Sequence, residues 1–411
     1  MAVDRTAKGP SPLANVGFRT LLASATVSYV GTFVQDVGER WLILEITGSA
    51  LSSALLATAF VTACLLMTLP AGVLADRMDR RRLVIYSQIA QAIVAVTIAT
   101  FALLHRATSG VLIAGAAAAG VAVALGGPAW STIVAESVPR EQVAEAVTLN
   151  AVSFNIARAV GPAIGGLVLA WAGGAGCFYS NAATFVLVIA AVASLRLPKN
   201  IETGDAKLLR AFAEPFAQAK RDAGIRSVLI SMVVFTFGAS FVYVLAPALA
   251  KLTLVAGPRS YGLIIGAMGT GAVLGATVLK KLRARYKPAR LLATLMVVYG
   301  LSAIALSRAP SIPIAMLCCV PAGVGWTGIF SSLSALVQIW TENRLRARAM
   351  ALYTMVHLAL WAVGSSISGV ISEAWSIRDA ILIGGLACIG AAIVTARLPL
   401  PPSFTGATTE S

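Results

Sequence analysis

Twelve apolar runs, each long enough to cross a lipid bilayer as an α-helix, divide this chain of 411 residues. The hydrocarbon core of a bilayer requires about 20 mostly apolar residues per helix. The composition is 58% hydrophobic and only 12% charged, and a soluble protein of this size could not bury so much apolar surface. We therefore predict an all-α integral membrane protein with twelve transmembrane helices, at residues 18–45, 51–74, 83–104, 110–134, 144–171, 177–196, 226–250, 259–280, 289–308, 311–338, 346–372 and 377–396.

Basic residues are distributed unevenly between the two sides of this membrane domain. If both termini face the cytoplasm, the loops on that side hold 25 of the 32 Lys and Arg residues, the opposite loops hold five, and two lie inside spans. Such an excess is typical of cytoplasmic loops, so we predict that both termini are cytoplasmic. The basic residues are spread over short loops that face anionic lipid headgroups, and this pattern argues against nucleic acid as a partner.

Motifs for catalysis or cofactor binding are missing from the sequence. His105 and His357 are the only histidines, and no GxSxG, HExxH or phosphate-binding glycine loop occurs. The five cysteines lie in apolar spans or at their edges, without CxxC or Cys/His ligand spacing. The first 17 residues have no apolar core of the kind that a cleavable signal needs. We therefore expect no enzyme, no metal site and no cofactor, and insertion directed by the first span.

The sequence matches itself at an offset of 203 residues (360 minus 157). Residues 157–168 read ARAVGPAIGGLV, and residues 360–371 read LWAVGSSISGVI. The same offset aligns Gly72 with Gly275. Polar and glycine matches at one offset predict two six-helix halves from a duplicated unit. The expected division is an N-terminal tail at 1–17, a first half at 18–196, a linker at 197–225, a second half at 226–396 and a C-terminal tail at 397–411.

The linker 197–225 is the one long polar connection in the chain. Leu208, Leu209, Phe212 and Phe216 recur in it at helical spacing, beside Lys and Arg residues. This pattern fits a short helix that lies on the cytoplasmic headgroups, and it fits a solvated linker equally well.

Two motifs and three longer phrases carry a family resemblance. The loop GVLADRMDRR (72–81) resembles the G-x-x-x-D-R-x-x-R-R loop of the major facilitator superfamily, and GPAIGG (161–166) is similar to its antiporter signature G-P-x-x-G-G. The phrases RWLILEITGSA (40–50), NIARAVGPAIGG (155–166) and RLRARAMALY (344–353) resemble the enterobactin-exporter-like branch of that superfamily. Two departures stand out: KKLRARYKPAR in the second half lacks the acidic residue, and span 4 lacks a buried arginine.

The gating loop is the first group of candidate site residues that the resemblance defines: Gly72, Asp76, Arg77, Arg80 and Arg81. The resemblance implies that Asp76 docks at the cytoplasmic start of span 11, where a helix N-terminus is partly positive and where Arg344, Arg346 and Arg348 cluster. Such a contact would hold the cytoplasmic side shut in one state. The alternative is that the basic residues only hold a turn inside the cell.

The antiporter-like motif comprises Gly161, Pro162, Gly165 and Gly166. Glycines at this spacing allow helices to approach closely, and proline bends a span because it removes one helix hydrogen bond. Helix packing and gating are both compatible with these residues.

Four charged residues lie inside the predicted spans: Asp36, Glu39 and Arg40 in span 1, and Arg158 in span 5. Spacings of three and four place the three charges of span 1 on one face. Charges inside a membrane must face protein or water and mark ion or substrate paths. They therefore form a candidate network for proton coupling, with Asp36 as the first candidate carrier and Glu39 as the second. A static set of ion pairs between spans 1 and 5 is the alternative.

A substrate cavity is predicted from aromatic, amide and imidazole side chains inside the spans. Packing against neighbours is the alternative role for each of them. The candidates are Phe33, Trp130, Asn155, Phe237, Tyr243, Trp326, His357 and Trp361.

The resemblance implies a secondary transporter of the bacterial inner membrane that works by alternating access. We expect it to export a siderophore, a drug or a similar amphipathic small molecule, in exchange for protons, and to act as a monomer in the lipid bilayer. An importer or facilitator of the same fold is the first alternative, and a membrane sensor that binds without transporting is the second.

Overall fold

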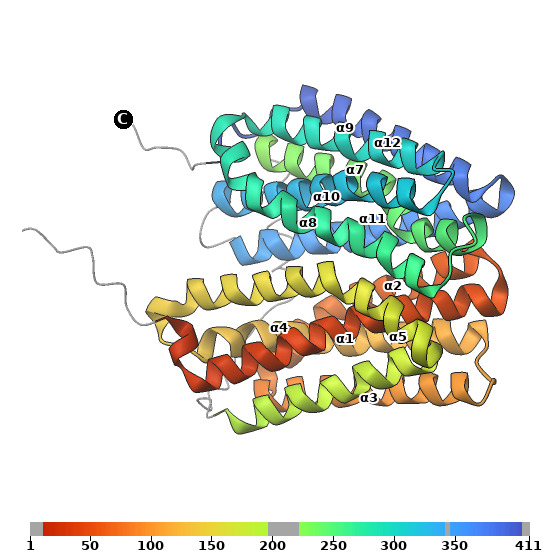
Figure 1. The fold of residues 1–411 in the computed structure, drawn as a ribbon. Coiled ribbons are helices and arrows are strands. Elements are labelled where there is room, and N and C mark those ends of the chain that lie inside the picture. The colour runs from red at the N-terminus through yellow and green to blue at the C-terminus, as the bar shows by residue number, and fades with distance from the viewer. Residues whose placement is uncertain (1–10, 196–221, 342–345, 405–411) are drawn as a thin grey trace, which may run out of the picture.

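The computed structural model describes residues 11–195, 222–341 and 346–404, without the side chains of Leu69, Val73, Asp76, Ala347 and Arg348. The predicted linker and the predicted N-terminal tail therefore lie largely outside the described residues, and the predicted C-terminal tail is described as far as residue 404. In the described part, long helices follow one another with short connections (Figure 1). They are α1 (Val16–Thr47), α2 (Ala50–Arg77), α3 (Arg80–Leu103), α4 (Ser109–Glu136), α5 (Val143–Ser194), α7 (Ala223–Ala248), α8 (Pro258–Arg285), α9 (Pro288–Ser307), α10 (Ile312–Trp340), α11 (Arg346–Ala374) and α12 (Ile377–Arg397).

The observed helices confirm the predicted all-α membrane fold. Ten of them, among the described residues, are long and apolar enough to span a membrane. α1 has 32 residues and is also long enough, but it is more polar because it carries Asp36, Glu39 and Arg40. α5 has 52 residues and bends at Gly173, whose φ of 66° and ψ of −173° are not helical. A residue with a side chain rarely adopts this backbone conformation, so Gly173 allows α5 to form two spans, as the sequence predicted.

Side-chain caps explain where several helices begin. Asn15 accepts hydrogen bonds from the amides of Gly17 and Phe18 at the start of α1. Ser49, Asp79 and Thr108 do the same for α2, α3 and α4. These side chains satisfy amides that have no partner inside the helix. Asp79, the second acid of the 72–81 loop, is therefore occupied as a cap.

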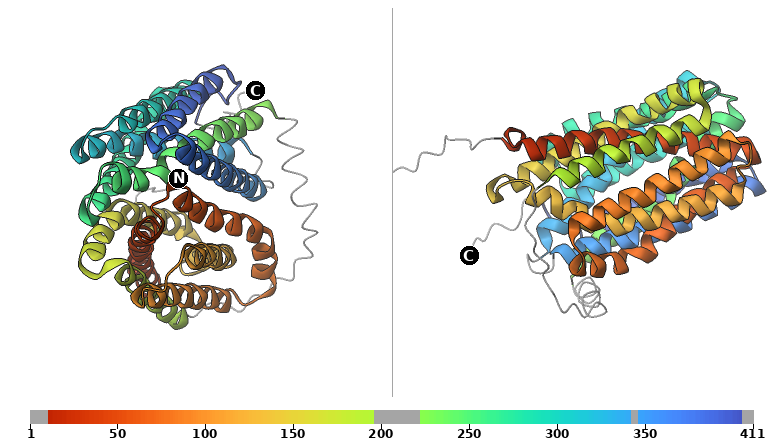
Figure 2. Two further views of the ribbon diagram at one scale, coloured as in Figure 1. Left: turned by 90° about the vertical axis from the view of Figure 1, so that its right-hand side faces the viewer. Right: turned by 90° about the horizontal axis from the view of Figure 1, so that it is seen from below.

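The helices form two groups that pack side by side (Figures 1 and 2). The halves repeat one packing scheme, since α1 packs on α5 and α2 on α4, while α7 packs on α11 and α8 on α10. Gly161 lies against the Phe33 side chain of α1, and Gly364, 203 residues later (364 minus 161), lies against the Phe237 carbonyl and the Ser240 side chain of α7. The halves are therefore built alike, in agreement with the internal repeat.

The halves meet mainly through α5 with α8 and α2 with α11. Both ends of the described chain lie at one end of the bundle, here called the termini end (Figures 1 and 2). The opposite, far end holds the α1–α2 turn and Gly173. At the far end, Ser49 donates a hydrogen bond to Glu373, and Thr58 bonds Ser366 at 3.1 Å slightly deeper, so α2 and α11 are joined there.

At the termini end, two apolar clusters are each confined to one half. The first contains Phe18, Leu83, Ile133 and Val192 of the N-terminal half. The second contains Ile225 and Leu352 of the C-terminal half with their neighbours. Among the described residues, the two halves therefore interlock at the far end and in the middle of the bundle.

Candidate functional site

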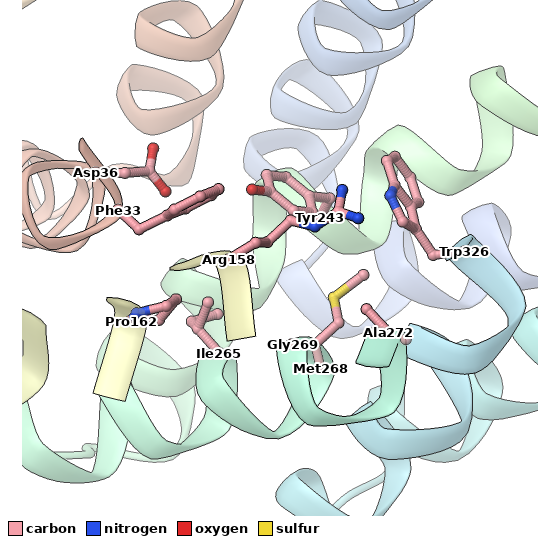
Figure 3. Close-up of a pocket in the computed structure, with 11 residues that line it drawn as sticks. Phe33, Asp36, Arg158, Pro162, Tyr243, Ile265, Met268, Gly269, Ala272 and Trp326 are labelled. Carbon is pink, nitrogen blue, oxygen red and sulfur yellow. The ribbon is translucent and has the colours of Figure 1, made fainter. Parts of the chain in front are cut away.

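A small cavity lies between the two halves, with a volume of about 30 Å³. α1 and α5 supply one wall, and α7, α8 and α10 supply the other (Figure 3). Several of its lining residues were not predicted, because small and aliphatic side chains carry no distinctive signal in apolar spans. The lining residues are Phe33, Asp36, Arg158, Pro162, Tyr243, Ile265, Met268, Gly269, Ala272, Gly323 and Trp326.

Asp36 and Arg40 form an ion pair at the edge of this cavity. The Arg40 Nε donates to Asp36 Oδ1 at 2.9 Å, one helical turn apart on α1. The Asp36 side chain is 31% exposed and lines the cavity, whereas that of Arg40 is only 9% exposed. The Arg40 guanidinium lies 5.6 Å from the ring centre of Tyr243 on α7, within range of a cation–π interaction. The ion pair therefore lines the cavity through Asp36 and contacts the C-terminal half through Arg40.

Glu39 occupies a different position from Asp36. It does not line the central cavity, and its Oε1 is buried without a hydrogen-bond partner in the described part of the chain. Nη1 of Arg40 is also buried and unpartnered. Although spacing suggested a common face, only Asp36 of the two acids faces the cavity.

Arg158 enters the cavity from α5 without an acidic partner. Its Nη2 donates to Asn155 Oδ1 at 2.6 Å, and its guanidinium lies 5.7 Å from the ring centre of Phe154. Arg158 makes none of the ion pairs found among the described residues, and its Nε is buried without a partner. The four charges therefore do not form one network in this conformation. Asp36 is paired with Arg40, whereas Arg158 has no ion-pair partner among the described residues.

An aromatic cluster in the C-terminal half borders the cavity through Tyr243 and Trp326. Their rings stack at 5.7 Å with an interplanar angle of 24°, and Trp361 meets both at 5.2 Å. His357 lies 5.7 Å from Trp361 and shares a hydrogen bond of 3.3 Å with Thr236. Trp361 and His357 therefore support the cavity wall from behind rather than line it.

The other cavity candidates lie apart from this pocket. Phe237 packs on Phe241 within α7, at 5.4 Å between ring centres. Asn155 holds Arg158, as described above. Trp130 lines a second pocket, inside the N-terminal half, where its Nε1 donates to the Tyr29 hydroxyl at 3.0 Å. Sequence alone could not show which of these residues line a pocket and which pack against neighbours, because they come from different helices whose packing is not known from the sequence.

The 72–81 loop is bound to the N-terminal half at its basic end. Arg80 pairs with Glu136 at the end of α4, and Arg81 donates to the carbonyl of Ala193 near the end of α5. Gly72 is partly buried and Arg77 is exposed. The side chain of Asp76 and the residues 342–345 lie outside the description, so the expected contact with α11 stays a prediction.

The antiporter-like motif faces two directions. Gly161 and Gly165 lie against α1, where their missing side chains leave room for Phe33 and Val37. These two glycines therefore serve packing inside the N-terminal half.

Gly166 lies instead against the other half. A Cβ atom placed on it would come 2.8 Å from the Cα of Gly262 and 2.9 Å from the carbonyl oxygen of Pro258 on α8. Pro162, one turn earlier, lines the cavity, and its carbonyl oxygen would lie 2.7 Å from a Cβ atom on Gly262. The second part of the motif therefore forms a glycine contact between the halves.

Replacing Gly166 with valine should push the two halves apart at the far end. Overpacking a tight contact costs about 1–3 kcal/mol, enough to shift a two-state ratio about tenfold. We expect a longer distance between spin labels at Thr108→Cys and Arg308→Cys. Gly390→Val is the matched control, because Gly390 has open space around it. An unchanged distance distribution in Gly166→Val would show that the contact does not limit opening.

Lys251 makes a further contact between the halves that the sequence did not suggest. It follows α7 in the π-helical turn η3 (Leu249–Thr253), and sequence assigned it only to an outer loop. Its Nζ lies 4.0 Å from the ring centre of Trp41 on α1, donates to the Trp41 carbonyl at 3.1 Å and is 3.9 Å from Glu45. The far end is therefore joined by a cation as well as by glycines.

Comparisons with known proteins place the chain among membrane transporters. A family model described as "transmembrane secretion effector" matches residues 7–410. The multidrug efflux pump Tap of Mycobacterium tuberculosis is 27% identical over 405 residues, which cover 95% of this chain and 94% of Tap. The enterobactin exporter EntS of Salmonella typhimurium is 26% identical over 359 residues, which cover 86% of this chain and 84% of EntS.

Among solved structures, a mutant of the nucleoside transporter NupG superposes with a TM-score of 0.74. The match covers 93% of this chain and 98% of NupG, at 14% sequence identity. At this identity the likeness supports the fold alone.

Proposed function

This chain belongs to the transmembrane secretion effector family of the major facilitator superfamily, a family of transporters rather than enzymes, and from that premise we propose that it exports an amphipathic small molecule by alternating access. The proposal includes proton exchange as the energy source and the bacterial inner membrane as the location. The relatives export drugs and enterobactin, by their names, and this supports a drug-like or siderophore-like substrate.

The central cavity is the observation that carries the proposal. Both halves line it, and it combines the carboxylate of Asp36 and the guanidinium of Arg158 with the rings of Phe33, Tyr243 and Trp326. A site between two halves can be exposed to each side of the membrane in turn when the halves rock. Charged and aromatic groups together favour amphipathic solutes.

Asp36 is the proposed proton carrier. Its carboxylate lines the cavity and is therefore reachable by a proton, and its partner Arg40 contacts Tyr243 of the other half. Movement of one half against the other would change the distance between Arg40 and Tyr243, and with it the environment of Asp36. This coupling of charge to movement is what exchange of substrate for proton requires. Glu39, which has a buried and unpartnered oxygen, is the reserve candidate.

Both termini are proposed to face the cytoplasm, so the far end would face outward and the described conformation would be closed to the outside. Asp76 would then belong to a contact with α11 that forms when the cytoplasmic side closes. This assignment is supported by the distribution of basic residues and by the inter-half contacts at the far end.

Cysteine labelling should distinguish the two ends of the bundle. In a variant without native cysteines, we expect an impermeant maleimide added to sealed cells to label Thr108→Cys, which precedes α4 at the far end, and to miss Lys287→Cys, which precedes α9 at the termini end. Both positions are exposed. After permeabilisation both should react fully. Labelling of Lys287→Cys in intact cells would reverse the proposed orientation.

The direction of transport is tested by dye accumulation in cells that lack their main efflux pumps. Expression of the protein should lower the steady-state content of amphipathic fluorescent dyes severalfold, and a protonophore should abolish the difference. Higher dye content on expression would favour import. Unchanged content across a panel of cationic, neutral and anionic dyes would contradict export.

A further inference from the structure

Arg158 stands out in the central cavity because part of its guanidinium has no partner. A buried polar group without a hydrogen bond costs about 1–3 kcal/mol, and more when it is charged. Nη2 bonds the neutral amide of Asn155, which accepts a hydrogen bond but supplies no negative charge. Nε is buried and unpartnered, and among the described residues no carboxylate forms an ion pair with Arg158. The cavity therefore contains an arginine whose charge is not neutralised by a direct contact.

The acid that shares the cavity is already engaged. Asp36 accepts from Arg40 at 2.9 Å, so its charge is balanced by that neighbour. In Figure 3, Asp36 lies at one edge of the pocket and Trp326 at the other, with the guanidinium of Arg158 between them beside Tyr243. A negatively charged group bound between Arg158 and Trp326 would thus lie on the side of the guanidinium away from Asp36.

Aromatic surfaces surround the guanidinium on several sides. Phe154 lies 5.7 Å from it and packs on Phe33, at 5.6 Å between ring centres. Tyr243 and Trp326 stack on each other and line the cavity. Aromatic side chains bind other rings by offset or edge-to-face packing, while an arginine fork binds carboxylates and similar oxyanions through two hydrogen bonds.

We infer that Arg158, with Tyr243, Trp326 and Phe33, forms a subsite for the anionic group of an aromatic solute. The inference rests on the proposed function and specifies its substrate class, an aromatic acid. In the described conformation the cavity has a volume of only about 30 Å³, so the solute would occupy this subsite when the two halves move apart. The anion would accept from the guanidinium of Arg158, whose Nε is buried and unpartnered in the described conformation, and the solute's ring would pack against the aromatic wall.

Three naphthalene probes of similar size test the inference by binding to the purified protein. The probes are 2-naphthoate, which is anionic, 2-naphthamide, which is neutral, and 2-naphthylmethylammonium, which is cationic. Binding is measured by tryptophan fluorescence, because Trp326 lines the pocket, with protein-free micelles as a blank. We expect 2-naphthoate to bind at least about tenfold more tightly than the other two, which corresponds to about 1.4 kcal/mol.

Variants identify the source of this preference. Arg158→Gln should remove the tenfold preference, Arg158→Lys should retain part of it, and the exposed control Arg106→Gln should leave it unchanged. Equal or tighter binding of the amide or the ammonium to the wild-type protein would overturn the inference, and so would no binding of any probe. A preference that survives in Arg158→Gln would also overturn it. If Arg158→Gln does not fold, the wild-type comparison and Arg158→Lys decide.

The binding experiment is independent of transport. A protein that prefers 2-naphthoate but does not alter dye accumulation would contradict export and leave the subsite intact. A protein that exports dyes but shows no preference for the anion would contradict the subsite alone.

Discussion

Arg40→Met should produce the largest loss of stability of any single change in the charged region of α1. The side chain is 9% exposed, and its loss leaves the carboxylates of Asp36 and Glu39 one turn of helix apart with no cation beside them. Removing one partner of a buried ion pair typically costs about 3–5 kcal/mol. We expect a clear decrease in the thermal unfolding midpoint of the purified protein, measured by intrinsic fluorescence, together with a lower yield of monodisperse protein.

A second substitution separates the loss of charge balance from the loss of packing. Asp36→Leu in the Arg40→Met background should recover part of the midpoint, because an apolar pair of similar volume is often as stable as a buried ion pair. Arg106→Gln, an exposed arginine in the α3–α4 connection, should leave the midpoint unchanged. If Arg40→Met unfolded at the wild-type temperature, or if the double variant were no more stable than the single one, the ion pair would not hold this part of α1.

Sequence predicted the helices well because a membrane allows few alternatives. Lipid cannot satisfy backbone groups, so an apolar run of sufficient length must be helical. The gap predicted between residues 171 and 177 contains Gly173, where α5 bends. The observed ends extend beyond the predicted spans by a few residues, as in α2, which continues to Arg77. Caps such as Asn15 and polar helix ends can lie outside the apolar run that hydropathy detects.

The direction in which a residue points could not be predicted from spacing. Gly165 and Gly166 are neighbours in one motif, yet the first packs on α1 and the second on α8, because adjacent helix positions face about 100° apart. Asp36 and Glu39 were likewise placed on one face of span 1, and only Asp36 lines the cavity. Which helix a side chain faces depends on how the helices pack in the bundle, and spacing along one helix does not contain this information.

Partners from distant parts of the chain were the hardest to foresee. Lys251 follows a long apolar helix, and nothing in its neighbourhood indicates that its ammonium group lies over Trp41, 210 residues earlier. Ion pairs between Arg158 and the acids of span 1 were one alternative from the sequence, but in this structure Arg158 bonds Asn155, three positions before it. A local amide can satisfy part of a guanidinium without moving the backbone, and sequence cannot rank that option against a distant carboxylate.

Asp36→Asn should uncouple transport from the proton gradient while leaving the protein folded. The asparagine Oδ1 can still accept from Arg40 Nε in the position of the carboxylate oxygen at 2.9 Å, so the loss of stability should be smaller than in Arg40→Met, which removes the hydrogen bond as well as the charge. Asparagine cannot take up and release a proton. In vesicles, uphill transport driven by a pH gradient should therefore fall at least about tenfold, equivalent to about 1.4 kcal/mol, while exchange of labelled for unlabelled substrate continues.

Two comparisons make the assignment of the carrier specific. Glu39→Gln is the matched control, since it removes the other acid of the region without touching the cavity, and it should retain gradient-driven transport. If Asp36→Asn instead unfolds, the ion pair is structural, because stranding Arg40 would then be the dominant effect. If Asp36→Asn keeps full proton-driven transport and Glu39→Gln loses it, the carrier is Glu39, and the proton must reach an oxygen that is buried in the described conformation. Movement of α1 against its neighbours would then be part of each proton transfer, whereas Asp36 can exchange its proton directly with the cavity between the two halves.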